Sequence, residues 1–194
     1  RGRGGLPPLE GPVLFIGNHQ LFGLLDQPLL VEEIWSQTGC LVRSLTDRSA
    51  FRVVDPNGTN AAPADTNGGE GSEGGWLLSV DFARFGAVPS SARSLYTLLE
   101  DGQPTLLFPG GLEEAYRSTK RNRRVDFVGW PDDADACDFA RIAARFDATI
   151  VAVAAVGADE SFATILDADE LRRLPFVGHR FGPDGTPTPP LAVP

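Results

Sequence analysis

The sequence predicts a single layered α/β domain with a central mixed, mostly parallel sheet flanked by helices. Two observations predict this fold class. Short apolar runs alternate with amphipathic segments along the chain, and several of these runs end in glycine-rich or polar loops. At 194 residues, the chain is also long enough to bury one sizeable core.

The first elements predict a strand, a helix and a second strand. Residues 12–16 (PVLFI) are an apolar run of strand length that a glycine ends. Residues 28–38 read as a helix, because Pro28 suits the first turn and Asp26 is placed to cap it. A second strand is expected at residues 41–45.

The middle of the chain is interrupted by a low-complexity segment. Residues 55–75 are rich in Gly, Asn, Ala and Asp, so we expect a disordered surface insertion within the domain. Beyond it, helices are expected at residues 76–85 and 91–100, and a short strand at 105–108.

The last elements are a helix, a strand and a tail. Residues 138–146 have amphipathic helical spacing. Residues 149–156 (TIVAVAAV) are a continuous apolar run, which predicts a central strand buried on both faces. Residues 182–194 are rich in Gly and Pro, so we expect a loose tail after a folded domain that spans residues 1–181.

Composition narrows the classes of partner. The net charge of −9 argues against nucleic-acid binding. Residues 117–124 (RSTKRNRR) form a basic patch, which is either a solvated loop or a site for phosphate or lipid headgroups. Cys40 and Cys137 lie in no metal-binding pattern, so we expect no metal site and a reducing compartment.

Two further observations concern membranes and the extent of the chain. No apolar run approaches the ~20 residues that span a bilayer, so we expect any membrane contact to be peripheral or to lie in sequence outside this chain. The chain begins with Arg1 and contains no Met, and we therefore expect a fragment of a longer protein.

His19 is the first candidate for chemistry. It follows the first predicted strand, at the edge of the sheet where α/β folds bind ligands, and its imidazole is suited to proton transfer near neutral pH. A structural loop histidine is an equally open reading. Asp26 either orients the imidazole or only caps the following helix. The other histidine, His179, has no comparable setting.

Three predicted strands end in the loops GNHQ, FPGGLEE and GADES, which we expect to converge. In the second loop, two glycines allow a ligand to approach the backbone and the next residues can open a helix, although a plain turn is the alternative. The sequence contains no serine-nucleophile elbow, Walker motif or dinucleotide fingerprint. Attack by a bound hydroxyl, with His19 as base, is the chemistry that remains.

Four blocks carry a family resemblance: GPVLFIGNHQLFGLLDQPLL from Gly11, FARFGAVPSSARSLYTLLEDG from Phe82, FPGGLEEA from Phe108, and FARIAARFDATIVAVAAVGADE from Phe139. They resemble the phytyl ester synthase and diacylglycerol acyltransferase-like group of plants and algae, within the lysophospholipid acyltransferase-like superfamily. The resemblance implies a glycerolipid acyltransferase-like fold and an O-acyltransferase. Such an enzyme moves a fatty acyl group from acyl-CoA or acyl carrier protein to a lipid alcohol such as diacylglycerol or phytol.

The resemblance also implies partners and a location. The acyl thioester is a co-substrate and no further cofactor is expected. The partners are the thioester donor, the lipid alcohol and a peripheral membrane or lipid-droplet surface. Relatives of this type often carry an upstream hydrolase-like domain and act in plastids, at plastoglobules or thylakoids. The endoplasmic reticulum is the alternative location.

The resemblance assigns roles to particular residues. His19 would be the general base and Asp26 its orienting partner. The block from Phe82 resembles the family's acceptor-binding motif and places two residues at the substrate, Gly86 and Arg93, although Arg93 is equally compatible with a solvent-facing helix charge.

The block from Phe108 resembles the family's third motif. It adds four substrate-binding residues: Pro109, Gly110, Gly111 and Glu114. The backbone N–H groups of Gly110 and Gly111 are expected to hold the oxyanion or an acceptor oxygen.

Two rival functions stay open. One is a lipid hydrolase or thioesterase, in which His19 activates water. The other is a catalytically impaired lipid-binding relative. The family's first motif places four residues between its His and Asp, whereas six separate His19 from Asp26.

Overall fold

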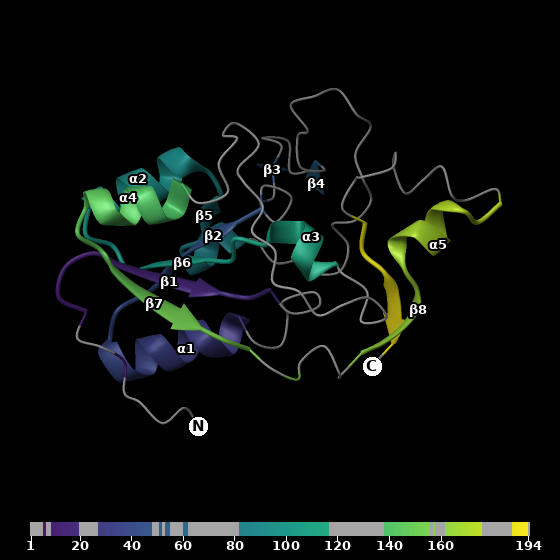
Figure 1. Ribbon diagram of the computed structural model, residues 1–194, viewed down its shortest axis with the longest axis horizontal. Coiled ribbons are helices and arrows are strands. Elements are labelled where there is room, and N and C mark those ends of the chain that lie inside the picture. The colour runs from purple at the N-terminus through teal and green to yellow at the C-terminus, as the bar shows by residue number, and fades with distance from the viewer. Residues whose placement is uncertain are drawn as a thin grey trace.

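The computed structural model describes residues 6, 9–19, 27–47, 51, 53–54, 60–61, 82–116, 138–155, 157, 162–175 and 188–193. Their central element is a five-stranded sheet with the order β5-β2-β6-β1-β7 (Figure 1). Its strands are β1 (Val13–Gly17), β2 (Arg43–Thr46), β5 (Val88–Pro89), β6 (Thr105–Leu107) and β7 (Thr149–Val153). Every neighbouring pair in this sheet is parallel, which confirms the predicted α/β fold class.

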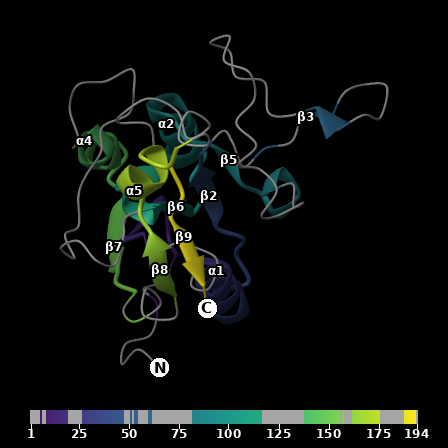
Figure 2. The same cartoon turned by 90° about the vertical axis from the view of Figure 1, so that its right-hand side faces the viewer.

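Helices cover both faces of the sheet. Helix α1 (Gln27–Thr38) lies on one face, and α2 (Ala92–Glu100) and α4 (Asp138–Arg145) lie side by side on the other (Figure 1). Figure 2 views the molecule from the carboxyl ends of the strands, with β7 and β5 on opposite sides of the sheet. The alternating side chains of β1 supply both cores, because Val13 and Phe15 pack with Ile34 of α1 while Leu14 packs with α2 and α4.

Local sequence explains where two of these helices begin. The hydroxyl of Ser91 accepts a hydrogen bond from the Ser94 N–H, which caps α2, and Leu95, Leu98 and Leu99 form its buried face. Helix α1 starts at Gln27, so Pro28 lies in its first turn as expected. Asp26, its predicted cap, lies outside the described residues.

The short helix α3 (Gly111–Ala115) follows β6 directly and lies at the carboxyl edge of the sheet. The expectation that the residues after the two glycines open a helix is therefore confirmed. Beyond the sheet, β8 (Ala163–Leu166) pairs antiparallel with β9 (Leu191–Val193), and α5 (Ala168–Arg172) follows β8 with an Asp167–Glu170 capping box (Figure 2). None of the helices in the described ranges has the length and apolar content needed to cross a membrane.

The prediction for the run at residues 149–156 was wrong about its position. Its strand β7 lies at the edge of the described five-stranded sheet, and Ile150 is 47% exposed. An apolar run shows which residues favour burial, but the number of neighbours depends on how the other strands pair.

Three other segments differ from expectation. In the range 76–85, the described part is a 3-10 turn, η4 (Phe82–Phe85), which ends at Gly86 with φ +82. Within the predicted tail, the strand pairing of β9 ties residues 191–193 to β8. Within the predicted insertion at 55–75, β4 (Asn60–Ala61) pairs with β3 (Val53–Val54), which precedes the insertion. The other residues of the insertion lie outside the described ranges.

Candidate active site

The three loops expected to converge follow three neighbouring strands. Strands β6, β1 and β7 are adjacent and parallel, so their carboxyl ends meet at one edge of the sheet. Asn18 and His19 follow the central strand of these three. Both residues are partly buried, and each is held from a different side.

Asn18 is bound to the chain that leaves β7. Its side-chain amide donates to the Ala155 carbonyl at 3.0 Å and accepts from the Ala155 N–H at 2.8 Å. Two such bonds reproduce the pattern of a peptide group in a sheet. The side chain thus continues the β1–β7 pairing one step beyond Gly17, the last paired residue of β1.

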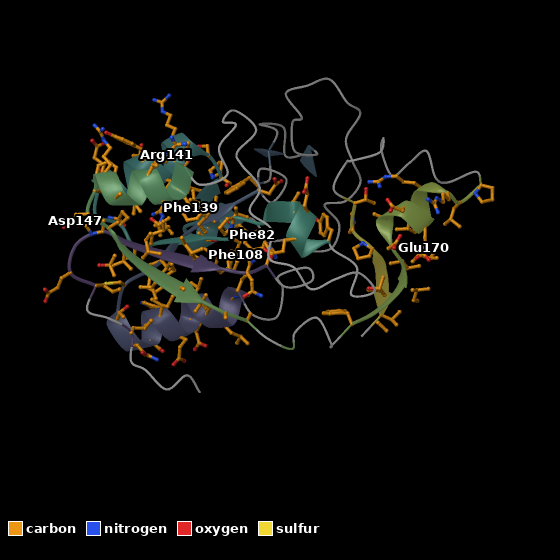
Figure 3. The ribbon with its side chains drawn as sticks, in the orientation of Figure 1. Phe82, Phe108, Phe139, Arg141, Asp147 and Glu170 are labelled. Carbon is orange, nitrogen blue, oxygen red and sulfur yellow. The ribbon has the colours of Figure 1, made fainter. Side chains whose placement is uncertain are left out.

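His19 is held on the β6 side by α3. Its backbone N–H donates to Oε2 of Glu114 at 2.8 Å. Glu114 is only 7% exposed, and a carboxylate at that depth is stabilised by an N–H donor. The imidazole ring also packs against the ring of Phe108, with 5.2 Å between the two ring centroids. Figure 3 labels Phe108 near the carboxyl ends of the strands.

The His19 ring has a third neighbour in α1. Nε2 of His19 lies 3.0 Å from Nε2 of Gln27. An amide nitrogen only donates, so the imidazole Nε2 accepts in this arrangement and the ring proton is placed on Nδ1. The Gln27 side chain thereby contacts the ring at Nε2 and helps to orient it.

The sequence analysis did not predict the contact of Gln27 with His19, nor the hydrogen bonds of Asn18 to the main chain of Ala155. The sequence held a signal for Gln27, because α1 follows β1 and a helix that packs back on the sheet begins at the carboxyl edge. For Asn18, the signal was the Asn-His pair itself, but its partner is 137 positions away.

The turn after β6 brings the predicted third-motif residues together beside His19. Pro109 and Gly110 are buried, and Gly111 adopts φ +54, a conformation that glycine favours. The Gly111 N–H donates to the Phe108 carbonyl at 3.1 Å within this turn. The expected oxyanion-binding roles of the Gly110 and Gly111 N–H groups stay predictions.

The residues predicted from the acceptor-binding block lie on elements other than those that hold His19. Arg93 is exposed in the first turn of α2, the helix that follows β5. Gly86 precedes β5, at the opposite end of the strand from the edge that bears His19. A Cβ on Gly86 would lie 3.0 Å from Leu41, so close packing explains this glycine. Substrate contacts at Gly86 and Arg93 stay predictions.

Several predicted features fall outside the described residues, and so their roles stay predictions. These are Asp26, the basic patch 117–124, Cys137 and His179. Cys40 is described, and its thiol is free.

An imidazole held by backbone and side-chain contacts at the carboxyl edge of a parallel sheet defines a site suited to proton transfer. The class of protein is an α/β domain with a histidine-centred candidate active site.

Comparison with known proteins then identifies the relatives. The chain is 33% identical over 177 residues to phytyl ester synthase 1, chloroplastic, of Arabidopsis thaliana, which covers 91% of this chain and 22% of that protein. It is 27% identical over 170 residues to phytyl ester synthase 2, chloroplastic, of the same plant, covering 88% of this chain and 21% of the relative. These similarities confirm the resemblance to a phytyl ester synthase-like family.

The chain thus spans about a fifth of the length of the curated relatives that it matches. No family model matches the chain, and no solved structure matches it.

Proposed function

We propose that this chain is an acyltransferase domain that moves a fatty acyl group from an acyl thioester to a lipid alcohol, with phytol as the first acceptor to test. The proposal also covers the finer points of donor and location: acyl-CoA or acyl carrier protein as donor, diacylglycerol as a second acceptor, and action at a plastid membrane or lipid-droplet surface. Its main support is the similarity to two chloroplastic phytyl ester synthases over about nine tenths of this chain.

His19 is the proposed general base. The lone pair of Nε2 takes the proton of the acceptor hydroxyl as its oxygen attacks the thioester carbonyl. The C–S bond then breaks, and the imidazolium returns the proton to the departing thiolate. The acceptor hydroxyl must take the place that the Gln27 amide holds at Nε2.

Asp26 is the proposed partner of the imidazolium, as the family resemblance implies. The contacts of His19 with Gln27, Phe108 and Glu114 support a ring held ready for proton transfer.

Replacing His19 by Ala tests the proposal. The purified protein is given a fatty acyl-CoA or an acyl carrier protein thioester together with phytol, and ester and free fatty acid are both measured. We expect wild-type protein to form ester and His19→Ala to lose ~10²–10⁴-fold in rate. His179→Ala is the matched control and is expected to retain wild-type turnover.

Two outcomes would contradict this function. Near-wild-type ester formation by His19→Ala would remove His19 from the mechanism. Release of free fatty acid without ester would indicate a hydrolase or thioesterase instead.

A further inference from the structure

Glu114 is a buried carboxylate that takes no part in the proposed proton transfer itself. It is 7% exposed in α3, and its Oε2 accepts the His19 N–H at 2.8 Å across 95 positions of sequence. The adjacent Glu113 is exposed on the same helix. The two neighbouring acids therefore differ in burial, and Glu114 points to the end of β1.

The absence of a side chain at Gly110 leaves room for this carboxylate. Its φ of −73 is open to any residue, so its conformation does not require glycine. The limited space does require glycine, because a Cβ on Gly110 would lie 2.1 Å from Oε2 and 2.6 Å from Cβ of Glu114. The turn after β6 thus leaves room for the Glu114 side chain to pass to the His19 loop.

Phe108 reinforces the same contact from the other end of the turn. Its ring packs against that of His19, and a Cβ on Gly17 would lie 2.8 Å from the Phe108 ring. The turn and α3 therefore contact the end of β1 at two residues: at the backbone of Gly17, and at both the ring and the N–H of His19. The residue between them, Asn18, is held from the β7 side.

We propose that Glu114 is a positioning residue for His19. It fixes the backbone of the loop, and so the place of the imidazole, by accepting the His19 N–H. This inference rests on the proposed function for its effect on rate. It gives Glu114 a role different from the substrate contact that the family resemblance implies.

The role depends on an acceptor oxygen and not on a charge. Glu114→Gln keeps an oxygen on a side chain of the same length, whereas Glu114→Ala removes it. We expect Glu114→Ala to lower kcat about 100-fold with little change in the KM of either substrate, since a small displacement of a catalytic group has this effect. Glu114→Gln should recover most of the rate, and Glu113→Ala, the matched control, should equal wild type.

A second readout follows the hydrogen bond itself. The chain has only two histidines, so protein labelled with ¹⁵N-histidine gives two backbone amide signals, and His179→Ala identifies that of His19. An N–H that donates to a carboxylate resonates downfield. We expect this signal to move upfield in Glu114→Ala and to stay near its wild-type position in Glu114→Gln and Glu113→Ala.

The two readouts separate this inference from the proposed function. If wild-type protein forms no ester, the proposed function fails, while the amide signal still decides whether Glu114 holds His19. If Glu114→Ala does not fold, Glu114→Asp replaces it, because its shorter side chain should weaken the same bond in folded protein. An unchanged His19 signal in the Ala or Asp variant, a Gln variant as slow as Ala, or a rise in KM alone would each overturn the proposal.

Discussion

The two strands that flank β1 hold the His19 loop in different ways. On one side, β6 is buried at all three of its residues, and the segment after it supplies two side chains, Phe108 and Glu114. On the other side, β7 is an edge strand of the described sheet, exposed at three of its five positions, and the chain after it supplies the main-chain groups of Ala155. A covered strand can place packed side chains at a site, whereas an edge strand offers mostly backbone.

The largest expected difference between the two sides is in stability. Leu106 of β6 is fully buried and Ile150 of β7 is 47% exposed. We expect Leu106→Ala to lower the free energy of unfolding by about 2–5 kcal/mol. Ile150→Ala should lower it by about 1 kcal/mol or less. Urea denaturation of both variants measures the difference, and equal losses would show that β7 is as well covered in solution as β6.

A smaller effect is expected where Asn18 joins β1 to the β7 side. Asn18→Ala removes both hydrogen bonds between this side chain and the partly buried main chain of Ala155. We expect a loss of about 1–3 kcal/mol in the free energy of unfolding. Asn18→Asp keeps the acceptor but places a carboxylate oxygen against the Ala155 carbonyl, so its loss should equal or exceed that of Asn18→Ala. Denaturant melts of the two variants test this order, and an unaffected Ala variant would show that the β7 side does not hold the loop.

The smallest expected effect is a dependence on alkaline pH on the β6 side. Tyr116 follows α3, and burial, together with the negative charge of Asp47, raises the pKa of its phenol above the usual 10.0. The unfolded chain therefore loses this proton at a lower pH than the folded chain does. The contribution of the protonated Tyr116 phenol to the stability of the folded chain is fully present below pH 10, and it is lost as the pH rises through the folded-state pKa.

Tyr116→Phe should therefore show a shallower fall in melting temperature above pH 10 than wild type. Thermal melts between pH 8 and about pH 11 measure the slopes. Identical slopes would mean that Tyr116 does not contribute to this pH dependence.

The elements of the interior could be predicted from sequence because each leaves a local pattern. The apolar run before Gly17 and the spaced leucines of α2 indicate the type of element and the buried face. The position of β7 could not be predicted, because the apolar character of Ile150 and its neighbours does not specify how many strands lie beside it. The pairing of Leu191–Val193 with β8 was missed for a similar reason, since a partner distant in sequence makes the strand.

In the candidate site, too, local features could be predicted from the sequence, whereas contacts between distant residues could not. His19 was identified from its local position after a strand, and the two glycines predicted the turn that precedes α3. The contacts of His19 with Glu114 and of Asn18 with Ala155 join residues 95 and 137 positions apart. They follow only once β6, β1 and β7 are known to be neighbours, in that order.

The fit between Gly110 and Glu114 has a consequence for how such a sequence can vary. A methyl group at position 110 occupies the space of the Glu114 carboxylate, so that carboxylate can be kept only while position 110 carries no side chain. The steric conflict therefore predicts that the two positions change together. A lineage that lost the acid at 114 would be released from glycine at 110, and one that gained a side chain at 110 would lose the contact that anchors the histidine loop.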